Sequence, residues 1–412
     1  MKALIISIGD EVLYGKIVNT NAAYLSKQLT TIGYDVISHY TVGDSYPVIY
    51  DIVKNVLVSD IDVVITTGGL GPTHDDFTKK VLADALGLEL IYYPEAFEHF
   101  DQYFKKRNIK TFNSNMSQAY FPKGSRLIPN NRGTALGAII NHNHKKFIIL
   151  VGPPYEMNEM FENTVKPFLE ENYPQDYFIE EYYAMGGGES EFEDLLKNLM
   201  KAHPNVVINP YASRGTIRYL LRSLKANIEE FHRVEQQFLN LLGDHIVGRA
   251  NKEVEEYVFD QLYANKQKIS IAESCTGGMF TSKLINVSGA SMVFDEGYIT
   301  YSNQSKTKNL GIPKSLINAY GAVSAEVAEA MAIGVKKKAN SSVGVGITGI
   351  AGPNGGTPLK PVGLVYFSFV IDDYVYVEKK IFNGAREDIR IRSTMYIMWR
   401  LLVELKNRNN QQ

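Results

Sequence analysis

The sequence predicts a multidomain α/β protein with an N-terminal α/β sheet domain, a small α+β middle domain and a C-terminal α/β domain. The chain has 412 residues, 45% of them hydrophobic, and at about 150 residues per domain this suffices for two or three conventional cores. Short β-branched runs alternate with helical patterns near both ends of the chain, which is typical of parallel sheets covered by helices. We expect the domains at residues 1–172, 175–248 and 251–412.

In the first domain, β-branched runs predict the strands of a mostly parallel sheet. A helix is expected after Gly152-Pro153-Pro154, running to about Glu171. A boundary then follows at Asn172–Gln175, because the residue before a proline disfavours helix. The other predicted elements are strands Ala3–Ile8, Val36–Val42, Asp62–Thr67 and Lys146–Val151, and helices Asn21–Ile32 and Phe77–Leu86.

The middle segment has the order β-α-β-β-α, which suits a small α+β domain. Its predicted elements are strand Tyr177–Met185, helix Glu189–Ala202, strands Val206–Asn209 and Gly215–Leu224, and helix Ile228–Leu242. In the last domain, the α/β alternation resumes and the tail Asn407–Gln412 is expected to fray. The elements there are helices Val254–Ala264 and Glu387–Lys406, and strands Lys268–Ala272, Met292–Tyr301, Ser342–Gly346, Gly363–Ile371 and Tyr374–Phe382.

Composition excludes several classes of protein. Forty-three basic against 45 acidic residues give a net charge of −2, so no global basic field exists to hold DNA and direct DNA binding is not expected. The single cysteine, Cys275, forms neither an internal disulfide nor a thiolate zinc site. The N-terminal run is strand-like, and no apolar run approaches the ~20 residues that span a bilayer. We therefore expect a cytoplasmic protein without a membrane segment.

The last domain lacks histidine, because all eight histidines precede residue 251. A Ser-His-Asp or Cys-His pair within that domain is therefore excluded. Yet Ile271–Gly278 runs from a strand through small residues into a helix, the form of a nucleophile site. If Ser274 is the nucleophile, its base must be a lysine, tyrosine or carboxylate. Lys306 is the candidate, with Tyr301 nearby in the sequence.

More ordinary interpretations of this segment stay open. It also fits a plain strand-to-helix turn with a solvated lysine downstream. Cys275, at the start of a helix, is an alternative nucleophile, although a small buried cysteine is the commoner outcome.

Two further segments of the last domain suggest ligand contacts. The glycine-dense loop Gly346–Gly356, which includes Gly349 and Gly352, would let the backbone approach a ligand closely, although glycine loops also occur as plain connectors. Arg386 and Arg390 are spaced i, i+4 at a helix start, which suits a phosphate clamp or, alternatively, a solvated basic face.

A glycine-rich turn in the first domain, Thr66–Asp76, also follows a strand and precedes a helix. Its amides suit phosphate or pyrophosphate. The neighbouring Asp75 and Asp76 could hold a hard metal ion, or one of them could merely cap the following helix. Asp10-Glu11 and Asp44 follow the first two strands, so in a parallel sheet they reach the same edge. His142 and His144 are too few for a zinc site.

Taken jointly, these motifs resemble the bacterial competence/damage-inducible CinA family over essentially the whole chain. The motifs that carry the resemblance are Gly9–Gly15, Asn19–Asn21, Thr66–Thr78, Gly188–Glu191, Ala272–Gly278, Tyr301–Asn303 with Lys306, Gly321–Ser324 and Gly349–Pro353. Three positions depart from the family pattern, and all lie in the first domain. Asn19 replaces an aspartate, Leu136 stands in Gly133–Gly137 where the family has proline, and Val151–Pro154 replaces Pro-Gly-Val-Pro.

The resemblance implies a molybdopterin-binding-like first domain with metal-dependent ADP-ribose pyrophosphatase activity and a C-terminal nicotinamide mononucleotide deamidase domain. Asp44 and Asp76 match the paired aspartates of enzymes that handle molybdopterin. A divalent metal is implied for the first domain and no cofactor for the last. The amides of Gly68, Gly69 and Gly71 would bind phosphate oxygens.

We therefore expect a pyridine-nucleotide recycling enzyme, as a homo-oligomer. Ser274, deprotonated by Lys306, would attack the carboxamide of nicotinamide mononucleotide, and water would resolve the acyl-enzyme. Tyr301 would relay a proton, and amides of Thr276, Gly277 and Gly278 would stabilise the oxyanion. Two alternatives are a non-catalytic nucleotide-binding protein that serves DNA uptake or recombination, and a molybdopterin-handling enzyme.

Overall fold

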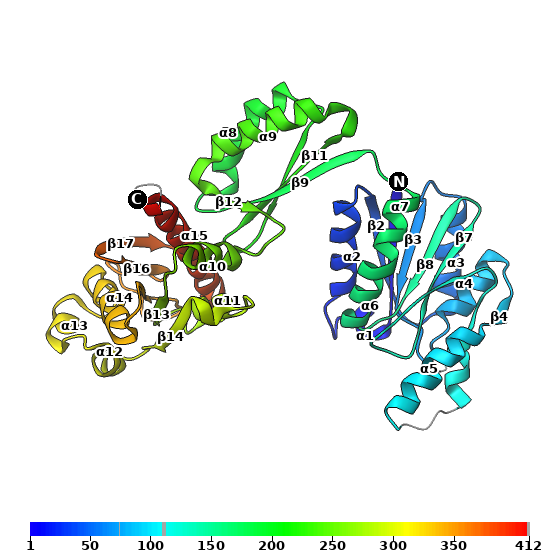
Figure 1. The fold of residues 1–412 in the computed structure, drawn as a ribbon, viewed down its shortest axis with the longest axis horizontal. Helices are drawn as coiled ribbons and strands as arrows, with labels where there is room; N and C mark the ends of the chain where they lie inside the picture. The colour runs from blue at the N-terminus through cyan, green and yellow to red at the C-terminus, as the bar shows by residue number, and fades with distance from the viewer. Residues whose placement is uncertain (74, 109–112, 410–412) are drawn as a thin grey trace. The chain divides into compact units, whose positions relative to one another are not determined.

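The computed structural model describes residues 1–73, 75–108 and 113–409. The chain forms two compact units, Met1–Ile179 and Glu180–Gln412 (Figure 1). Each unit is a mixed α/β structure, as the sequence predicts. None of the helices in the described residues is both long and apolar enough to span a bilayer.

The first unit is built on a six-stranded sheet of order β2-β1-β3-β8-β7-β6. The first four strands are parallel, and β7 and β6 continue the sheet antiparallel. The prediction of a mostly parallel sheet is therefore confirmed. The strands are β1 (Lys2–Ile8), β2 (Asp35–Val42), β3 (Val63–Thr67), β6 (Arg126–Ile128), β7 (Gly137–His142) and β8 (Lys145–Leu150), and β4 (Leu90–Tyr92) pairs separately with β5 (Tyr120–Pro122).

Helices cover both faces of this sheet, because the crossovers β1-α2-β2 and β2-α3-β3 run in opposite directions and each is right-handed. Helix α2 packs against α6, and α3 packs against α4. Strand β3 is buried along its whole length, which suits a central parallel strand. The helices are α1 (Asp10–Leu13), α2 (Thr20–Thr31), α3 (Tyr46–Leu57), α4 (Thr78–Leu86), α5 (Pro94–Lys106), α6 (Pro154–Met160) and α7 (Lys166–Asn172), the last two joined by a π-helical turn, Phe161–Val165.

A four-stranded sheet, order β10-β11-β9-β12, follows in the chain. The sequence predicts all of its elements except β12, whose four residues are too few to show alternation. Helices α8 and α9 pack together. The elements are β9 (Tyr177–Ala184), α8 (Glu189–Ala202), β10 (Val207–Ala212), β11 (Ile217–Leu224), α9 (Ile228–Leu242) and β12 (Ile246–Arg249).

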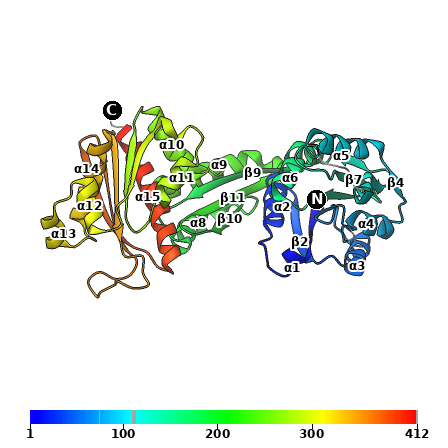
Figure 2. The same ribbon diagram turned by 90° about the horizontal axis from the view of Figure 1, so that it is seen from below.

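A five-stranded sheet of order β14-β13-β15-β16-β17 completes the second unit. Strand β13 is parallel to both neighbours, and the remaining pairs are antiparallel. Figure 2 shows α14 on one face of this sheet and α15 on the other. The strands are β13 (Ile269–Glu273), β14 (Phe294–Ile299), β15 (Val343–Gly349), β16 (Leu364–Ile371) and β17 (Tyr374–Ile381), and the helices are α10 (Val254–Ala264), α11 (Met279–Ile285), α12 (Asn303–Leu310), α13 (Lys314–Tyr320), α14 (Ala325–Ala339) and α15 (Arg386–Asn409).

Two sequence expectations differ from the structure here. The strand expected from Met292 begins at Phe294, because Ala290–Met292 forms a 3₁₀ turn. The prediction of a frayed tail is wrong for residues 407–409, which continue α15. The rest of that tail, 410–412, lies outside the described residues.

Gly186, between β9 and α8, provides a test of the packing in the second unit. It has a φ of 86°, and a Cβ there would lie 2.2 Å from the ring of Trp399 on α15. Gly311 has a similar φ of 71°, but a Cβ there would meet no atom within 4 Å. Gly311→Ala therefore imposes backbone strain alone, and Gly186→Ala adds overpacking against Trp399.

We predict that Gly186→Ala lowers the free energy of unfolding by about 1–3 kcal/mol more than Gly311→Ala does, the usual cost of overpacking. Urea unfolding followed by fluorescence measures this directly, because Trp399 is the single tryptophan of the chain. Equal decreases in the free energy of unfolding in the two variants would contradict the predicted overlap between the added Cβ and Trp399.

Candidate active site

Ser274 is held at the carboxyl end of β13, in the middle of the second unit's five-stranded sheet. Its amide donates to the Ile347 carbonyl on the neighbouring strand at 3.0 Å. The side chain is 7% exposed. The strand therefore presents a hydroxyl at an edge where ligands of α/β sheets commonly bind.

Lys306 reaches this serine from α12. Ser302 caps that helix, since its hydroxyl accepts from the Ser305 amide at 3.0 Å. One turn later, Lys306 Nζ lies 3.1 Å from Ser274 Oγ and donates to the Thr300 carbonyl at 2.8 Å. The side chain is 1% exposed, and burial lowers the pKa of its amine from the ordinary value. A deprotonated amine in this position is able to take a proton from the serine.

Cys275 is as buried as Ser274, at 6% exposed, and also lines the cleft described below. Burial raises the pKa of its thiol to about 12, so the thiol is protonated near neutral pH. Lys306 is hydrogen-bonded to Ser274, which has the amine at its oxygen.

Glu273, which sequence reasoning missed, organises the loop that follows Ser274. Its carboxylate is 1% exposed and accepts from the amides of Gly278 (3.0 Å), Phe280 (3.2 Å) and Thr281 (2.8 Å). The Thr281 hydroxyl is a fourth donor, at 2.7 Å. A side chain of the protein thus occupies the start of α11, where an anion of the substrate was expected.

The amides expected to stabilise an oxyanion have other partners. The Gly277 amide donates to the Ser274 carbonyl at 3.1 Å, and the Gly278 amide donates to Glu273. The Thr276 amide lies beside the Cys275 thiol. The Gly277 and Gly278 amides therefore have partners within the loop, and for Gly278 that partner is the buried carboxylate one residue before the serine.

Arg386, at the start of α15, joins two other expected site segments. Its guanidinium donates to the Gly352 carbonyl at 2.7 Å and to the Tyr301 hydroxyl at 2.8 Å. Arg390, one turn later, donates to the Thr276 carbonyl at 2.8 Å. Arg386 is therefore placed to meet a ligand, whereas Arg390 braces the loop after Ser274.

A cleft of about 190 Å³ lies over Ser274 and Lys306. Tyr301, Gly349 and Arg386 also line it, whereas Thr276, Gly277, Gly278, Gly352 and Arg390 do not. Four lining residues were missed as site residues, although they fall in the motifs Gly321–Ser324 and Gly346–Gly356: Ala322, Val323, Thr348 and Ala351. The Thr348 hydroxyl donates to the Ala322 carbonyl at 2.7 Å, which joins these two motifs.

A second cleft, of about 390 Å³, lies at the carboxyl edge of the first unit's parallel strands. Expected residues line it from three loops: Glu11 after β1, Asp44 after β2, and Gly68, Gly69, Gly71, Asp75 and Asp76 after β3. Gln118, Thr134 and Glu156 also line it and were missed, although Thr134 lies in the family segment Gly133–Gly137. His74, within the same glycine-rich turn, lies outside the described residues.

Negative charge accumulates in this second cleft. Burial raises the pKa of Asp44, and the nearby carboxylates of Asp10, Asp75 and Glu11 raise it further. Asp76 accepts from the Thr73 amide at 3.0 Å. Neither Asp75 nor Asp76 caps α4, whose N-cap is Phe77 without a side-chain hydrogen bond.

A divalent cation suits this donor set chemically, because carboxylate oxygens are its preferred ligands and its charge would relieve the repulsion around Asp44. Across the described parts of the chain, no group of three or more His, Cys, Asp or Glu side chains is arranged to hold a metal ion.

The three segments that depart from the family pattern lie in different parts of the first unit. Asn19 caps α2 by accepting from the Ala22 amide at 3.0 Å, and it does not line the larger cleft of this unit. Leu136 is buried in the core. Gly152 and Pro153 do line the cleft. Of the three departures, only the one at Val151–Pro154 therefore lies in the wall of this cleft.

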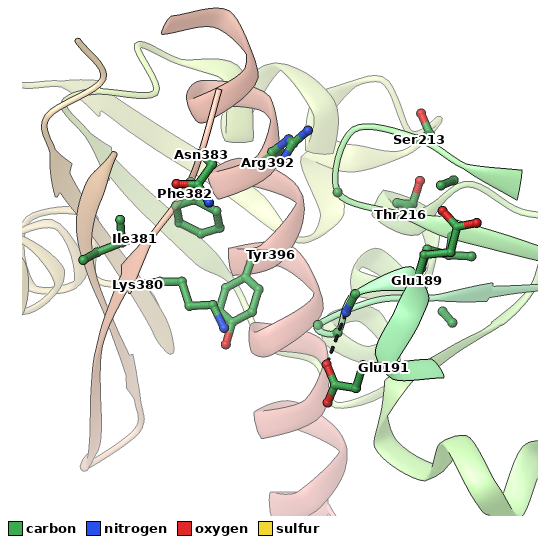
Figure 3. A pocket seen from close by; sticks show the side chains of 17 residues that line it. Glu189, Glu191, Ser213, Thr216, Lys380, Ile381, Phe382, Asn383, Arg392 and Tyr396 are labelled. Atoms are coloured by element: carbon green, nitrogen blue, oxygen red, sulfur yellow. Dashed lines mark hydrogen bonds between the residues drawn. The ribbon is translucent and has the colours of Figure 1, made fainter. Parts of the chain in front are cut away.

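A larger cavity, of about 590 Å³, lies in the second unit and contains none of the expected site residues. Figure 3 shows Lys380, Phe382, Asn383, Arg392 and Tyr396 on one side of it, and Glu189, Glu191, Ser213 and Thr216 on the other. The first group belongs to β17, the loop that follows it and α15, and the second to the start of α8 and the β10–β11 hairpin.

The chain matches two known protein families and full-length relatives. Residues 251–405 match the family model described as the CinA C-terminal domain, and residues 4–171 match the probable molybdopterin binding domain. A competence-damage inducible protein of Thermoanaerobacter pseudethanolicus is 41% identical over 402 residues, 97% of each chain. One of Alkaliphilus oremlandii is 41% identical over 413 residues, 99% of this chain and 100% of that protein.

Solved structures match part of the chain. A CinA superfamily protein of Escherichia coli is 30% identical, covers 37% of this chain and 88% of its own, and has a TM-score of 0.36. The CinA protein of Thermoplasma acidophilum is 34% identical, covers 40% and 98%, and has a TM-score of 0.38. Because relatives 41% identical cover nearly all of both chains, the protein belongs to the CinA, or competence-damage inducible, family, with a molybdopterin-binding-like domain followed by a CinA C-terminal domain.

Proposed function

We propose that the protein hydrolyses the amide of nicotinamide mononucleotide to nicotinate mononucleotide and ammonia, and so recycles pyridine nucleotide. The observation that carries this proposal is the buried Lys306 amine 3.1 Å from Ser274 Oγ, in a cleft that Arg386 also lines. A serine with a lysine base is a known solution for amide hydrolysis without histidine. An arginine in the same cleft suits a phosphorylated substrate.

In the proposed reaction, neutral Lys306 takes the proton of Ser274, whose oxygen attacks the carboxamide carbon. The tetrahedral intermediate collapses when Lys306 returns the proton to the amide nitrogen, and ammonia leaves. Water then attacks the ester, Lys306 accepts its proton, and nicotinate mononucleotide is released as Ser274 is restored. Tyr301, hydrogen-bonded to Arg386 at 2.8 Å, is placed to relay protons at the cleft mouth.

For the first unit we propose hydrolysis of the pyrophosphate of ADP-ribose. The supporting observation is a cleft lined by Asp44 and by a glycine-rich turn that ends in Asp75 and Asp76. Asp44 and Asp76, together with oxygens of the substrate, would hold a divalent cation, which would neutralise pyrophosphate charge when bound. The glycines also serve packing, since a Cβ at Gly68 would lie 2.1 Å from the Ile8 carbonyl oxygen.

Two other functions compete with this proposal. A non-catalytic nucleotide-binding protein acting in competence or recombination would bind both nucleotides without turnover. A molybdopterin-handling enzyme would bind a pterin in the first unit. Incubation of the whole chain with nicotinamide mononucleotide and with ADP-ribose, with assay of both products, separates these possibilities.

We predict that Ser274→Ala lowers deamidation by at least about 10³-fold, because the nucleophile is lost. Ammonia release and circular dichroism together measure activity and fold. Cys275→Ser is the matched control and should retain activity, since the buried thiol is protonated. Activity in Ser274→Ala, or its loss in Cys275→Ser, would contradict the assignment of the nucleophile.

The lowered pKa of Lys306 predicts the pH dependence of the reaction. The neutral amine is the active form, so kcat/KM should rise with pH and level off above an apparent pKa lower than the ordinary lysine value of about 10.4. Lys306→Arg keeps the charge but does not deprotonate, and it should lose nearly all activity at every pH. An active arginine variant would show that Lys306 contributes only charge.

Chelation should separate the two proposed activities. We predict that EDTA abolishes release of AMP from ADP-ribose and that added Mg²⁺ restores it, because carboxylates alone repel the pyrophosphate. Deamidation should be unchanged, because Ser274 and Lys306 need no metal. Loss of both activities, or of neither, would contradict the proposed division of chemistry between the two units.

A further inference from the structure

The hairpin between β10 and β11 touches the start of the helix that carries Arg386. Arg214, at the hairpin turn, places its Nε 3.1 Å from Asp388 Oδ1 and its Nη1 3.4 Å from Glu387 Oε1. Both acidic residues lie in the first turn of α15. An ion pair therefore links the small four-stranded sheet to this helix end.

Asp388 transmits this contact to the segment just before Arg386. Its second oxygen, Oδ2, accepts from the Ala385 amide at 3.0 Å. The Asp388 side chain is 25% exposed. The Asp388 carboxylate thus stabilises the first turn of α15 through Oδ2. Its other oxygen, Oδ1, contacts Arg214, which orients the carboxylate.

Gly215 supplies an independent contact one turn further along α15. It has a φ of 91°, and a Cβ there would lie 3.0 Å from Met395 Cβ and 3.4 Å from Arg392 Cα. The hairpin tip therefore lies directly against the helix. The 590 Å³ cavity of Figure 3 adjoins this contact, so the tip is not embedded in a continuous core.

The first turn of α15 matters for the cleft because Arg386 donates from it to both Gly352 and Tyr301. We propose that Arg214 is a positioning residue: through Asp388 it fixes the first turn of α15, and so sets the affinity of the deamidase cleft for its phosphorylated substrate. The small four-stranded sheet then contributes to substrate binding in that cleft. This inference rests on the proposed function for its substrate, but the contact itself is independent of it.

The test compares Arg214→Ala with Arg249→Ala in the whole chain. Arg249 lies in the same sheet and pairs with Glu180 at 2.9 Å, so its loss removes a similar ion pair away from α15. Half-exposed ion pairs are weak, so we expect KM for nicotinamide mononucleotide to rise about two-fold to five-fold in Arg214→Ala with kcat unchanged. Arg214→Lys should restore part of the affinity, and Arg249→Ala should match the parent.

Hydrogen exchange of the backbone amides of residues 385–390, measured without substrate, provides a readout that needs no activity. Arg214→Ala and Gly215→Ala should both speed exchange there, and Arg249→Ala should not. The proposal would be overturned if Arg214→Ala and Arg249→Ala showed the same exchange rates and the same KM. It would also be overturned if Arg214→Ala lowered kcat and left KM unchanged. If the parent protein fails to deamidate the nucleotide, the proposed function fails, and exchange alone decides the role of Arg214.

Discussion

Burial of the Lys306 amine beside Ser274 is the constraint on which the chemistry proposed for the second unit depends. A lysine that is 1% exposed has lost its hydration, so its charged form is disfavoured. The remaining partners, the Ser274 hydroxyl and the Thr300 carbonyl, are neutral. The same desolvation that makes the amine costly to bury makes it useful as a base.

Separate elements of the fold hold Ser274 and Lys306 in position. Strand β13 fixes Ser274 through its pairing with β15, and the cap at Ser302 fixes the helix that delivers Lys306. Glu273 then closes the loop after the serine with a carboxylate that accepts four hydrogen bonds. Charge-assisted hydrogen bonds of this kind are strong in a buried setting. Ser274 is therefore followed by a loop that these hydrogen bonds hold in one conformation.

Sequence reasoning predicts the layout of the sheets and the Ser274–Lys306 pair because both depend on local signals: β-branched runs, glycine turns and the absence of histidine. It does not foresee that the Gly278 amide donates to Glu273, because only the folded strand determines the direction of that side chain. It misses β12 because that strand is defined by pairing with β9. The same limit applies to Arg214, whose partners on α15 lie more than 170 residues away along the chain.

The central claim is that Ser274 forms the covalent bond to the substrate, and its most direct test is a mass measurement on acid-quenched enzyme. Protein mixed with nicotinamide mononucleotide, quenched within one turnover and digested, should contain the Ser274 peptide as an ester of nicotinate mononucleotide. Lys306→Arg should not accumulate this species. An adduct on Cys275, or turnover with no adduct on any residue at any quench time, would contradict the account.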